Sequence, residues 1–212
     1  MASFRRIAIG VSLILLFPSL SFGQPQPKKE ITVESVREML QKFYFEEWKD
    51  YDTLVGYGAA AFPVYDAILA DPNHLSIERE RIFVVVAAVN ADGTRYRELA
   101  IKSLSHKDKY LRSAAAHLLA KIGTEQDTAP VVALLSDEDA TVVRESANTL
   151  AAIGGWRDLV AIDAWLRSAK AQKIAESWLK HVEKARDALK KRLDDAENRK
   201  APPPRPVAPR RP

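Results

Sequence analysis

Apolar residues recur at helical spacing along the middle of the chain, and the same pattern returns after about 31 residues. One set, with its counterparts 31 positions later, is Ala116, Leu119, Ile122 and Gly123, then Ala147, Leu150, Ile153 and Gly154. A second set with the same spacing is Leu104, Leu135 and Leu166. A fixed period of this length is typical of a solenoid, in which each unit buries its apolar face against its neighbours. The pattern therefore predicts an α-solenoid.

About four helix pairs are predicted in this region, because apolar residues recur three or four positions apart and turn-forming residues separate the runs. The predicted first helices are Phe62–Ala70, Tyr96–Leu104, Ala129–Leu135 and Trp156–Leu166. The predicted second helices are Ile77–Val89, Lys109–Ile122, Ala140–Ile153 and, approximately, Gln172–Leu193. Another helix, Val33–Phe45, precedes the pairs, with Thr32 as its N-cap.

The two ends of the repeat region differ from its middle. Asp50 or Asp52 is expected to cap a short helix before the first pair, and Gly123 is expected at the C′ position after a second helix. The last helix breaks the register, since Trp178, His181 and Lys184 stand where the repeat would place Ala, Leu and Ile. A terminal repeat with a polar outer side is what closes a solenoid. We therefore expect a long C-terminal capping helix.

The repeated units resemble a known family. Asp108–Gly123 and Asp139–Gly154 both look like the second half of a short HEAT repeat, of the type also called PBS-lyase-like. Residues 54–69, with Pro63, resemble the first helix of such a repeat, so that the resemblance covers about residues 54–170. It implies an all-α, right-handed α-solenoid that serves as a binding scaffold, and it implies no reaction.

The beginning of the chain reads as a secretory signal peptide, residues 1–23. Arg5 and Arg6 form a short basic region, Ile7–Phe17 is apolar, and Ser21 to Gly23 place small residues before a cleavage site. The apolar run of 11 residues is shorter than the roughly 20 that a spanning helix needs. We expect cleavage near Gly23 and a periplasmic or secreted protein, with residues 24–31 as a linker.

The charge of the chain is concentrated at its ends. The formal net charge is +4, yet the leader supplies two positive charges and residues 199–212 supply five, so residues 24–198 carry −3. The predicted solenoid domain, 32–198, therefore has no basic excess that would favour nucleic acid. Residues 199–212 are rich in Pro and Arg and are expected to be a disordered tail. This tail could dock in an aromatic groove, bind an anionic membrane or wall surface, or have no role.

Residue types that carry chemistry are scarce or badly spaced. The chain has no cysteine, and its four histidines form no metal-binding motif. No glycine-rich phosphate loop or nucleophile elbow is present. The resemblance implies that Asp108 with Arg112 and Asp139 with Arg144 bond the backbone and neighbouring units, although the third unit is one residue shorter between Arg and Gly. We predict no catalytic residue, no cofactor, no metal and no enzyme activity.

A binding surface is the remaining prediction. In HEAT-type solenoids the second helices line the concave side, and their non-core positions here are His117, Lys121, Arg144, Glu145 and Asn148. Trp156 is added as an anchor, because tryptophan is enriched at binding hot spots. Trp48 could serve likewise, whereas Trp165 and Trp178 are expected in the core. An ordinary solvated face explains the same polar residues equally well.

Three functions follow from these observations. The first is an exported, non-enzymatic protein–protein interaction scaffold, whose partner is another protein. The second, suggested only by the repeat type, is a lyase-like chaperone or an enzyme subunit. The third is an envelope-tethering protein that acts through its basic proline-rich tail. The sequence leaves the identity of the partner and the oligomeric state open.

Overall fold

The computed structural model describes residues 31–42, 49–89, 91–172 and 175–200, and these residues form helices without any strand. The predicted signal peptide, nearly all of the predicted linker and residues 201–212 lie outside the described residues. The elements are α1 Val33–Lys42, α2 Lys49–Tyr57, η1 Gly58–Ala61, α3 Phe62–Ala70, α4 Ser76–Ala88, η2 Thr94–Tyr96, α5 Arg97–Ser103, α6 Lys109–Ile122, η3 Glu125–Asp127, α7 Thr128–Ala133, η4 Leu134–Ser136, α8 Ala140–Ile153, α9 Trp156–Ala171 and α10 Glu176–Lys200.

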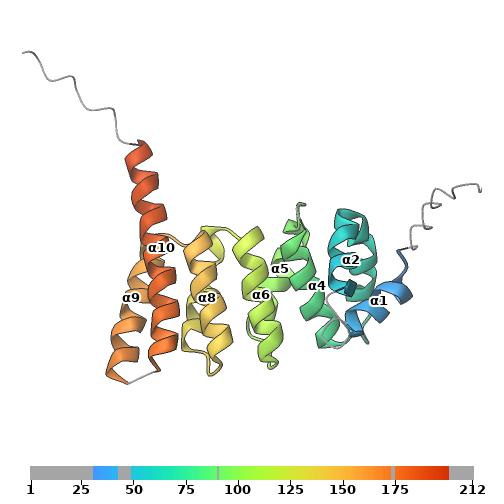
Figure 1. Ribbon diagram of the computed structural model, residues 1–212, viewed down its shortest axis with the longest axis horizontal. Helices are drawn as coiled ribbons and strands as arrows, with labels where there is room; N and C mark the ends of the chain where they lie inside the picture. The colour runs from blue at the N-terminus through green and yellow to red at the C-terminus, as the bar shows by residue number, and fades with distance from the viewer. Residues whose placement is uncertain (1–30, 43–48, 90, 173–174, 201–212) are drawn as a thin grey trace, which may run out of the picture. The chain divides into compact units, whose positions relative to one another are not determined.

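The helices form four successive pairs, α3/α4, α5/α6, α7/α8 and α9/α10. The second helices α4, α6, α8 and α10 pack side by side in chain order, as Figure 1 shows. Corresponding parts of neighbouring second helices lie together. Lys109, at the start of α6, contacts Asp139, just before the start of α8, and further along the Thr149 hydroxyl of α8 donates to the Ala116 carbonyl oxygen of α6. Consecutive second helices therefore run parallel, and the predicted all-α solenoid is confirmed.

Helix bounds agree with the sequence pattern in the middle of the chain and depart from it toward the end. α3, α6 and α8 begin and end where the pattern predicts. α9 continues to Ala171 instead of ending at Leu166, and the Gln172 amide donates to the Ser168 carbonyl oxygen beyond its end. α10 consequently begins at Glu176 rather than Gln172, and it continues to Lys200 instead of Leu193.

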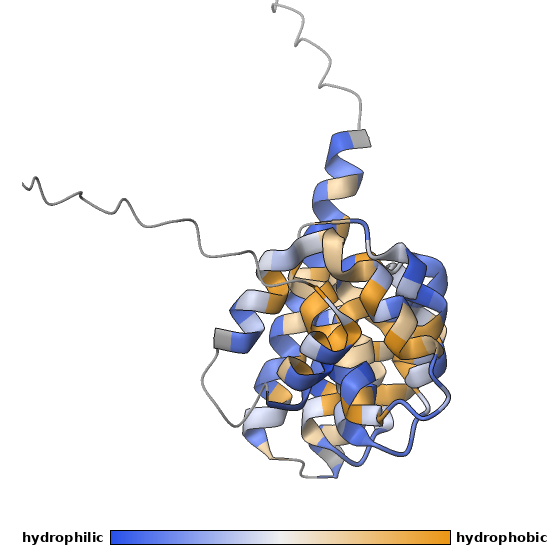
Figure 2. Ribbon diagram, turned by 90° about the vertical axis from the view of Figure 1, so that its right-hand side faces the viewer, coloured by the Kyte–Doolittle hydropathy of each residue, from blue (hydrophilic) through white to orange (hydrophobic). Residues whose placement is uncertain are grey.

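The apolar stripes of the second helices form one continuous core. Leu119 of α6 and Leu150 of α8 are fully buried, and Leu189 of α10 extends the same core to the last repeat. Figure 2, seen along the row of helices, shows hydrophobic residues gathered between the helices and hydrophilic residues on the outside. Because full burial of one such side chain contributes about 1.5–3 kcal/mol, the stripes account for the stacking of the repeats.

Two aspartates begin the second helices of the central repeats. The Asp108 carboxylate accepts a hydrogen bond of 2.9 Å from the Tyr110 amide, and the Asp139 carboxylate accepts one of 2.8 Å from the Thr141 amide. At the start of α1 the Thr32 hydroxyl accepts a hydrogen bond from the Ser35 amide at 3.1 Å. Such caps satisfy backbone donors that have no partner within the helix, and they confirm the predicted starts of these helices.

Gly123 ends α6 in a different way from the one that its sequence position predicts. A C′ glycine usually adopts a left-handed conformation, yet Gly123 is extended, with φ −78° and ψ 172°. A Cβ at this position would lie 2.6 Å from the Leu119 carbonyl oxygen and 2.9 Å from Ile153 Cδ1. Glycine is needed here because a Cβ would meet both the backbone of α6 and a side chain of the next repeat, and a positive φ has no part in it.

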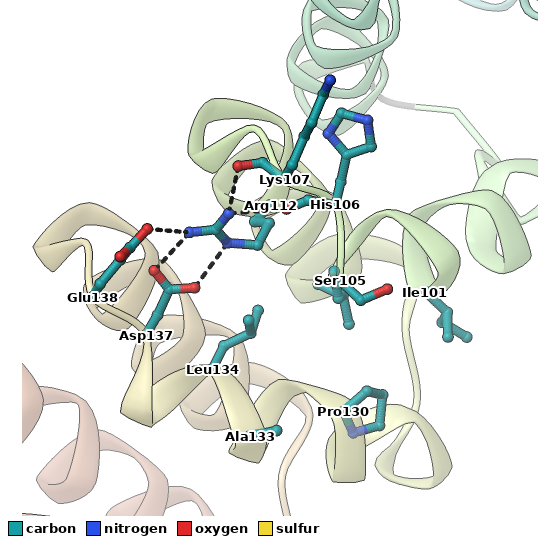
Figure 3. Close-up of a pocket in the computed structure, with 11 residues that line it drawn as sticks. Ile101, Ser105, His106, Lys107, Arg112, Pro130, Ala133, Leu134, Asp137 and Glu138 are labelled. Atoms are coloured by element: carbon teal, nitrogen blue, oxygen red, sulfur yellow. Dashed lines mark hydrogen bonds and ion pairs between the residues drawn. The ribbon is translucent and has the colours of Figure 1, made fainter.

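Arg112 ties the second repeat to the third (Figure 3). Its guanidinium group donates two hydrogen bonds of 2.8 Å to the Asp137 carboxylate, in the turn before α8. It also donates to the carbonyl oxygens of His106 and Lys107, at 2.9 and 3.0 Å. This side chain is nearly buried, so the bidentate pair stabilises the contact between the two turns.

Further ion pairs join residues about one repeat apart. Arg97 donates two hydrogen bonds of 2.7 Å to the Asp127 carboxylate, 30 positions later. Lys109 reaches Asp139 at 2.8 Å with the same separation. Arg192 of α10 donates to backbone carbonyl oxygens at the end of α8. These contacts hold each repeat in register with the next.

One described stretch, Asp50–Ala70, has the length and mean hydropathy of a membrane span. It is made of α2, η1 and α3, and Gly58, with φ +58°, interrupts it. Tyr65 and Ile68 within it are fully buried in the core. Packing of its buried residues against the rest of the solenoid accounts for part of the apolar character of the stretch, while several of its small apolar residues are exposed.

Candidate interaction surface

The second helices of the last three repeats each turn one face outward. On α6 the face carries Tyr110, His117 and Lys121, and on α8 it carries Thr141, Arg144, Glu145 and Asn148. On α10 it carries Ser177, Lys180, His181, Lys184 and Lys191. Most of these positions are three or four residues apart, and Tyr110 to His117 and Lys184 to Lys191 are seven apart, which places them on one side of each helix. Because the helices lie side by side, the residues form one continuous area, named here the second-helix surface.

Glu145 connects α6 to α8 on this surface. Its carboxylate lies 3.6 Å from His117 Nδ1 and 3.0 Å from an Nη atom of Arg144. Burial raises the pKa of the Glu145 carboxyl, but hydrogen bonds from His117 and Arg144 outweigh it and hold this pKa below the ordinary value. Glu145 is therefore a fixed negative charge that orients two side chains which the sequence singled out for partner binding.

A small pocket of about 200 Å³ lies between α8 and α10. Its lining residues are Ala140, Thr141, Val143, Arg144, Ser177, Trp178, His181 and Val182. The His181 Nδ1 atom lies 2.7 Å from the Ser177 carbonyl oxygen and donates to it, which leaves Nε2 as the free ring nitrogen. The pocket thus combines a guanidinium group, an imidazole, hydroxyl groups and an indole.

Tyr110 is the most exposed aromatic side chain on the second-helix surface, with 63% of its area accessible. The Lys109 ammonium group lies 5.3 Å from the centre of its ring. Tyrosine is favoured in binding sites because one rigid side chain offers both apolar area and a hydroxyl group. Tyr110 was not among the residues predicted from the sequence to bind a partner. Its place as the second residue of α6 could have indicated it.

The structure brings together five of the six residues predicted to bind a partner. His117 and Lys121 lie on α6, and Arg144, Glu145 and Asn148 lie on the adjacent face of α8. Trp156, the sixth, is the first residue of α9 and is 42% exposed. It belongs to a first helix and is no part of the second-helix surface.

The remaining tryptophans are placed as follows. Trp165 is partly buried and packs against the core, in agreement with the prediction. Trp178 is only half-buried and borders two pockets beside α8, so it is less of a core residue than its spacing indicated. Trp48 lies outside the described residues.

Arg112 and Arg144 have different roles, contrary to the expectation from the family resemblance. In the 31-residue register Arg112 corresponds to Val143, so Arg144 lies one position further round its helix. Arg112 is turned toward the next repeat and bonds Asp137, whereas Arg144 is exposed and pairs with its own neighbour Glu145. This one-residue shift takes Arg144 out of the contact between repeats and leaves it on the second-helix surface.

An open groove of about 670 Å³ lies between the first helices α5 and α7 (Figure 3). Ile101, Leu104, Pro130, Ala133 and Leu134 make its walls largely apolar. Two charged residues that line the groove, Arg112 and Asp137, already form an ion pair with each other. Within the described part of the chain no group of three His, Asp or Glu residues is placed to hold a metal ion.

Comparison with protein families identifies HEAT repeats in this chain, over residues 78–152 and again over residues 97–177. A comparison with curated proteins finds no match. The matched region runs from α4 to the beginning of α10, which is the part that forms the stacked pairs. HEAT repeats generally mediate interactions between proteins. The chain is therefore a HEAT repeat domain-containing protein.

Proposed function

We propose that this chain is an exported, non-enzymatic scaffold that binds another protein through its second-helix surface. The observation that carries this proposal is the continuity of that surface across α6, α8 and α10, with exposed polar side chains and an exposed tyrosine. A mixed polar and aromatic area of this kind is typical of sites where proteins associate without a permanent apolar interface.

The charged residues of the central repeats have structural roles in the part of the chain that the structure describes, and this supports the non-enzymatic part of the proposal. Asp108 and Asp139 cap helices, and Arg112 and Asp137 clamp two repeats together. Each of these charged groups has a structural partner, so none is poised as a free nucleophile or proton-transfer group. The exported location rests on the leader-like residues 1–23.

Affinity capture with a matched pair of variants tests the proposal. The full chain is used to capture proteins from a native extract of the source cells, beside Asn148→Trp and Glu98→Trp. Asn148 is exposed at the centre of the second-helix surface, and Glu98 is exposed on the first helix α5. Both variants add the same bulky side chain, and circular dichroism checks that both remain folded.

We expect wild type and Glu98→Trp to capture the same partner protein, and Asn148→Trp to lose it, because an indole at this position would hold an opposing surface away. Equal capture by Asn148→Trp and wild type would contradict the proposal. Loss with Glu98→Trp alone would assign binding to the first helices instead.

A further inference from the structure

The second-helix surface carries far more positive than negative charge. Its basic residues are Lys121, Arg144, Lys180, Lys184 and Lys191, against two acidic residues, Glu145 on α8 and Asp195 one turn beyond Lys191 on α10. By contrast, residues 24–198 as a whole carry a net charge of −3. The positive charge is therefore concentrated on one face of a domain that is otherwise acidic.

Three of these cations have no partner of their own. Arg144 is paired with Glu145, and Lys180 is paired with Glu176 one turn earlier. Lys121, Lys184 and Lys191 form no ion pair with any residue that the structure describes. Since ion pairs are common elsewhere along the solenoid, this face has unpaired positive charge available to an external ligand.

The three lysines lie on α6 and α10, the two helices that flank α8. His117 of α6 contacts Glu145 of α8, which sets α6 beside α8, and the pocket formed by Arg144 and His181 sets α8 beside α10. Lys184 follows His181 by three residues, and Lys121 follows His117 by four. Lys184 therefore lies about one turn beyond the pocket on α10, and Lys121 lies one turn beyond His117 on α6, where it also borders the end of α4.

The pocket between α8 and α10 has the size and the donors for a single carboxylate group. Arg144 offers guanidinium N–H groups that Glu145 does not use. Thr141 and Ser177 add hydroxyl donors at the pocket edge. Hydrogen bonds of this kind to an ionised carboxylate are stronger than bonds between neutral groups.

We propose that the second-helix surface recognises an acidic segment of its protein partner, rich in Asp and Glu. This inference rests on the proposed function and names the chemistry of the partner. One carboxylate occupies the pocket at Arg144, Thr141 and Ser177, and neighbouring carboxylates pair with Lys121 and Lys184. Lys191, about two turns after Lys184 on α10, attracts further carboxylates of the same segment.

A protein segment fits these features better than a nucleic acid or a lipid headgroup layer. Glu145 lies in the middle of the surface and would repel a continuous row of phosphates. A peptide can place its carboxylates on either side of Glu145 and set uncharged residues against it. The exposed ring of Tyr110 also offers apolar contact for a side chain of such a segment.

The test measures binding of a short fluorescein-labelled poly-glutamate peptide to the full chain by fluorescence anisotropy. One variant carries Lys121→Glu, Lys184→Glu and Lys191→Glu. The matched control carries Lys102→Glu, Arg157→Glu and Arg167→Glu, which are exposed cations on the first helices α5 and α9. Both variants change the net charge equally and keep the basic tail, so long-range attraction and tail binding are the same in both.

We expect wild type and control to bind the peptide, with affinity that falls as salt is added, and the surface variant to bind it at least about tenfold more weakly. Equal binding by the two variants, or no binding by wild type, would overturn the inference. Binding of poly-phosphate or of anionic vesicles, lost in the surface variant while poly-glutamate fails to bind, would also overturn it.

Failure of this test is distinguishable from failure of the proposed function. If Asn148→Trp abolishes capture of a partner while poly-glutamate does not bind, the surface binds a protein of different chemistry. If poly-glutamate binds at the surface while Asn148→Trp captures its partner normally, the surface binds anions but the partner protein binds elsewhere.

Discussion

At the scale of single residues, the contacts between repeats depend on a few positions where a larger side chain would not fit. Replacement of Gly123 by Ala adds a methyl group that would meet the Leu119 carbonyl oxygen and the Ile153 side chain. We expect Gly123→Ala to lower the free energy of unfolding by about 1–3 kcal/mol, as overpacking usually does. Urea denaturation measures this change.

Gly56 provides the control for this substitution. It lies inside α2, is exposed, and a Cβ there would meet nothing within 4 Å. Because alanine is favoured over glycine in helix interiors, Gly56→Ala should raise stability by about 0.5–1 kcal/mol. Equal effects of the two substitutions would contradict the steric explanation of Gly123.

Asp137 gives the solenoid a pH dependence of defined sign. Burial raises the pKa of the Asp137 carboxyl, but hydrogen bonds from Arg112 and from the Asp139 amide outweigh it, so this pKa lies below its ordinary value of 3.8. The ion pair therefore contributes its full stability above about pH 4, and this contribution is lost as the pH falls through the lowered pKa.

We expect Asp137→Asn to lower the free energy of unfolding near neutral pH by about 1–3 kcal/mol, with a smaller difference from wild type under acidic conditions. Urea denaturation at several pH values measures both. Glu138→Gln, at a neighbouring carboxylate that is 92% exposed, serves as control and should change little. A constant difference between Asp137→Asn and wild type at all pH values would contradict the role given to this ion pair.

Some of these residue roles could be predicted from the sequence, and others could not. Asp108 and Asp139 follow from the rule that acidic side chains cap helices. The role of Arg112 in the contact between repeats follows from the family resemblance, but its partner Asp137 does not. Arg144 was misread because a shift of one residue turns a side chain by about 100° around a helix. The charge of the second-helix surface becomes visible only when α6, α8 and α10 are placed together.

At the scale of elements, the second helices carry the core that neighbouring repeats share. Leu119 and Leu150 are fully buried between α4, α6, α8 and α10. We expect Leu119→Asp and Leu150→Asp each to unfold the solenoid, since an unpaired buried carboxylate is strongly unfavourable. Loss of helical circular dichroism and of a cooperative melting transition measures this.

Val160→Asp is the matched control. Val160 lies on α9 with 65% of its area exposed, so that the new carboxylate would be in water. This variant should melt close to wild type. A Leu150→Asp protein that also melted like wild type would contradict the shared core.

Two helices whose first and last residues the sequence predicted correctly have a capping residue before them and a helix-ending residue after them. α6 and α8 have an aspartate cap before them and a glycine after them, and the period of 31 residues fixes their faces. α9 and α10 lack such a glycine at their junction. The extent of α9 depends instead on tertiary contacts, such as Lys170 with Glu183 at 2.7 Å, which no local pattern reveals.

At the scale of the whole molecule, α10 closes the C-terminal end of the solenoid. Its buried residues Val182, Ala185 and Leu189 cover α8 and α9. We expect deletion of residues 176–212 to lower the melting temperature and to cause association, because the exposed apolar area resembles an open repeat interface. Light scattering during thermal melting measures both effects.

Deletion of residues 201–212 alone removes the proline-rich tail and leaves α10 intact. This shorter chain should melt like wild type and remain monodisperse to the same degree. If deletion of residues 176–212 were equally harmless, α10 would have no role as a cap.

Site-specific photo-crosslinking tests the central claim most directly, because it asks which face of the folded chain touches its partner. A crosslinking amino acid is placed at His117, Asn148 or Lys184, one on each of α6, α8 and α10, and at Glu98, Ala133 or Val160, one on each of three first helices. The account predicts that the three second-helix positions capture the same partner protein and that the first-helix positions do not. Crosslinks confined to the first-helix positions would contradict it.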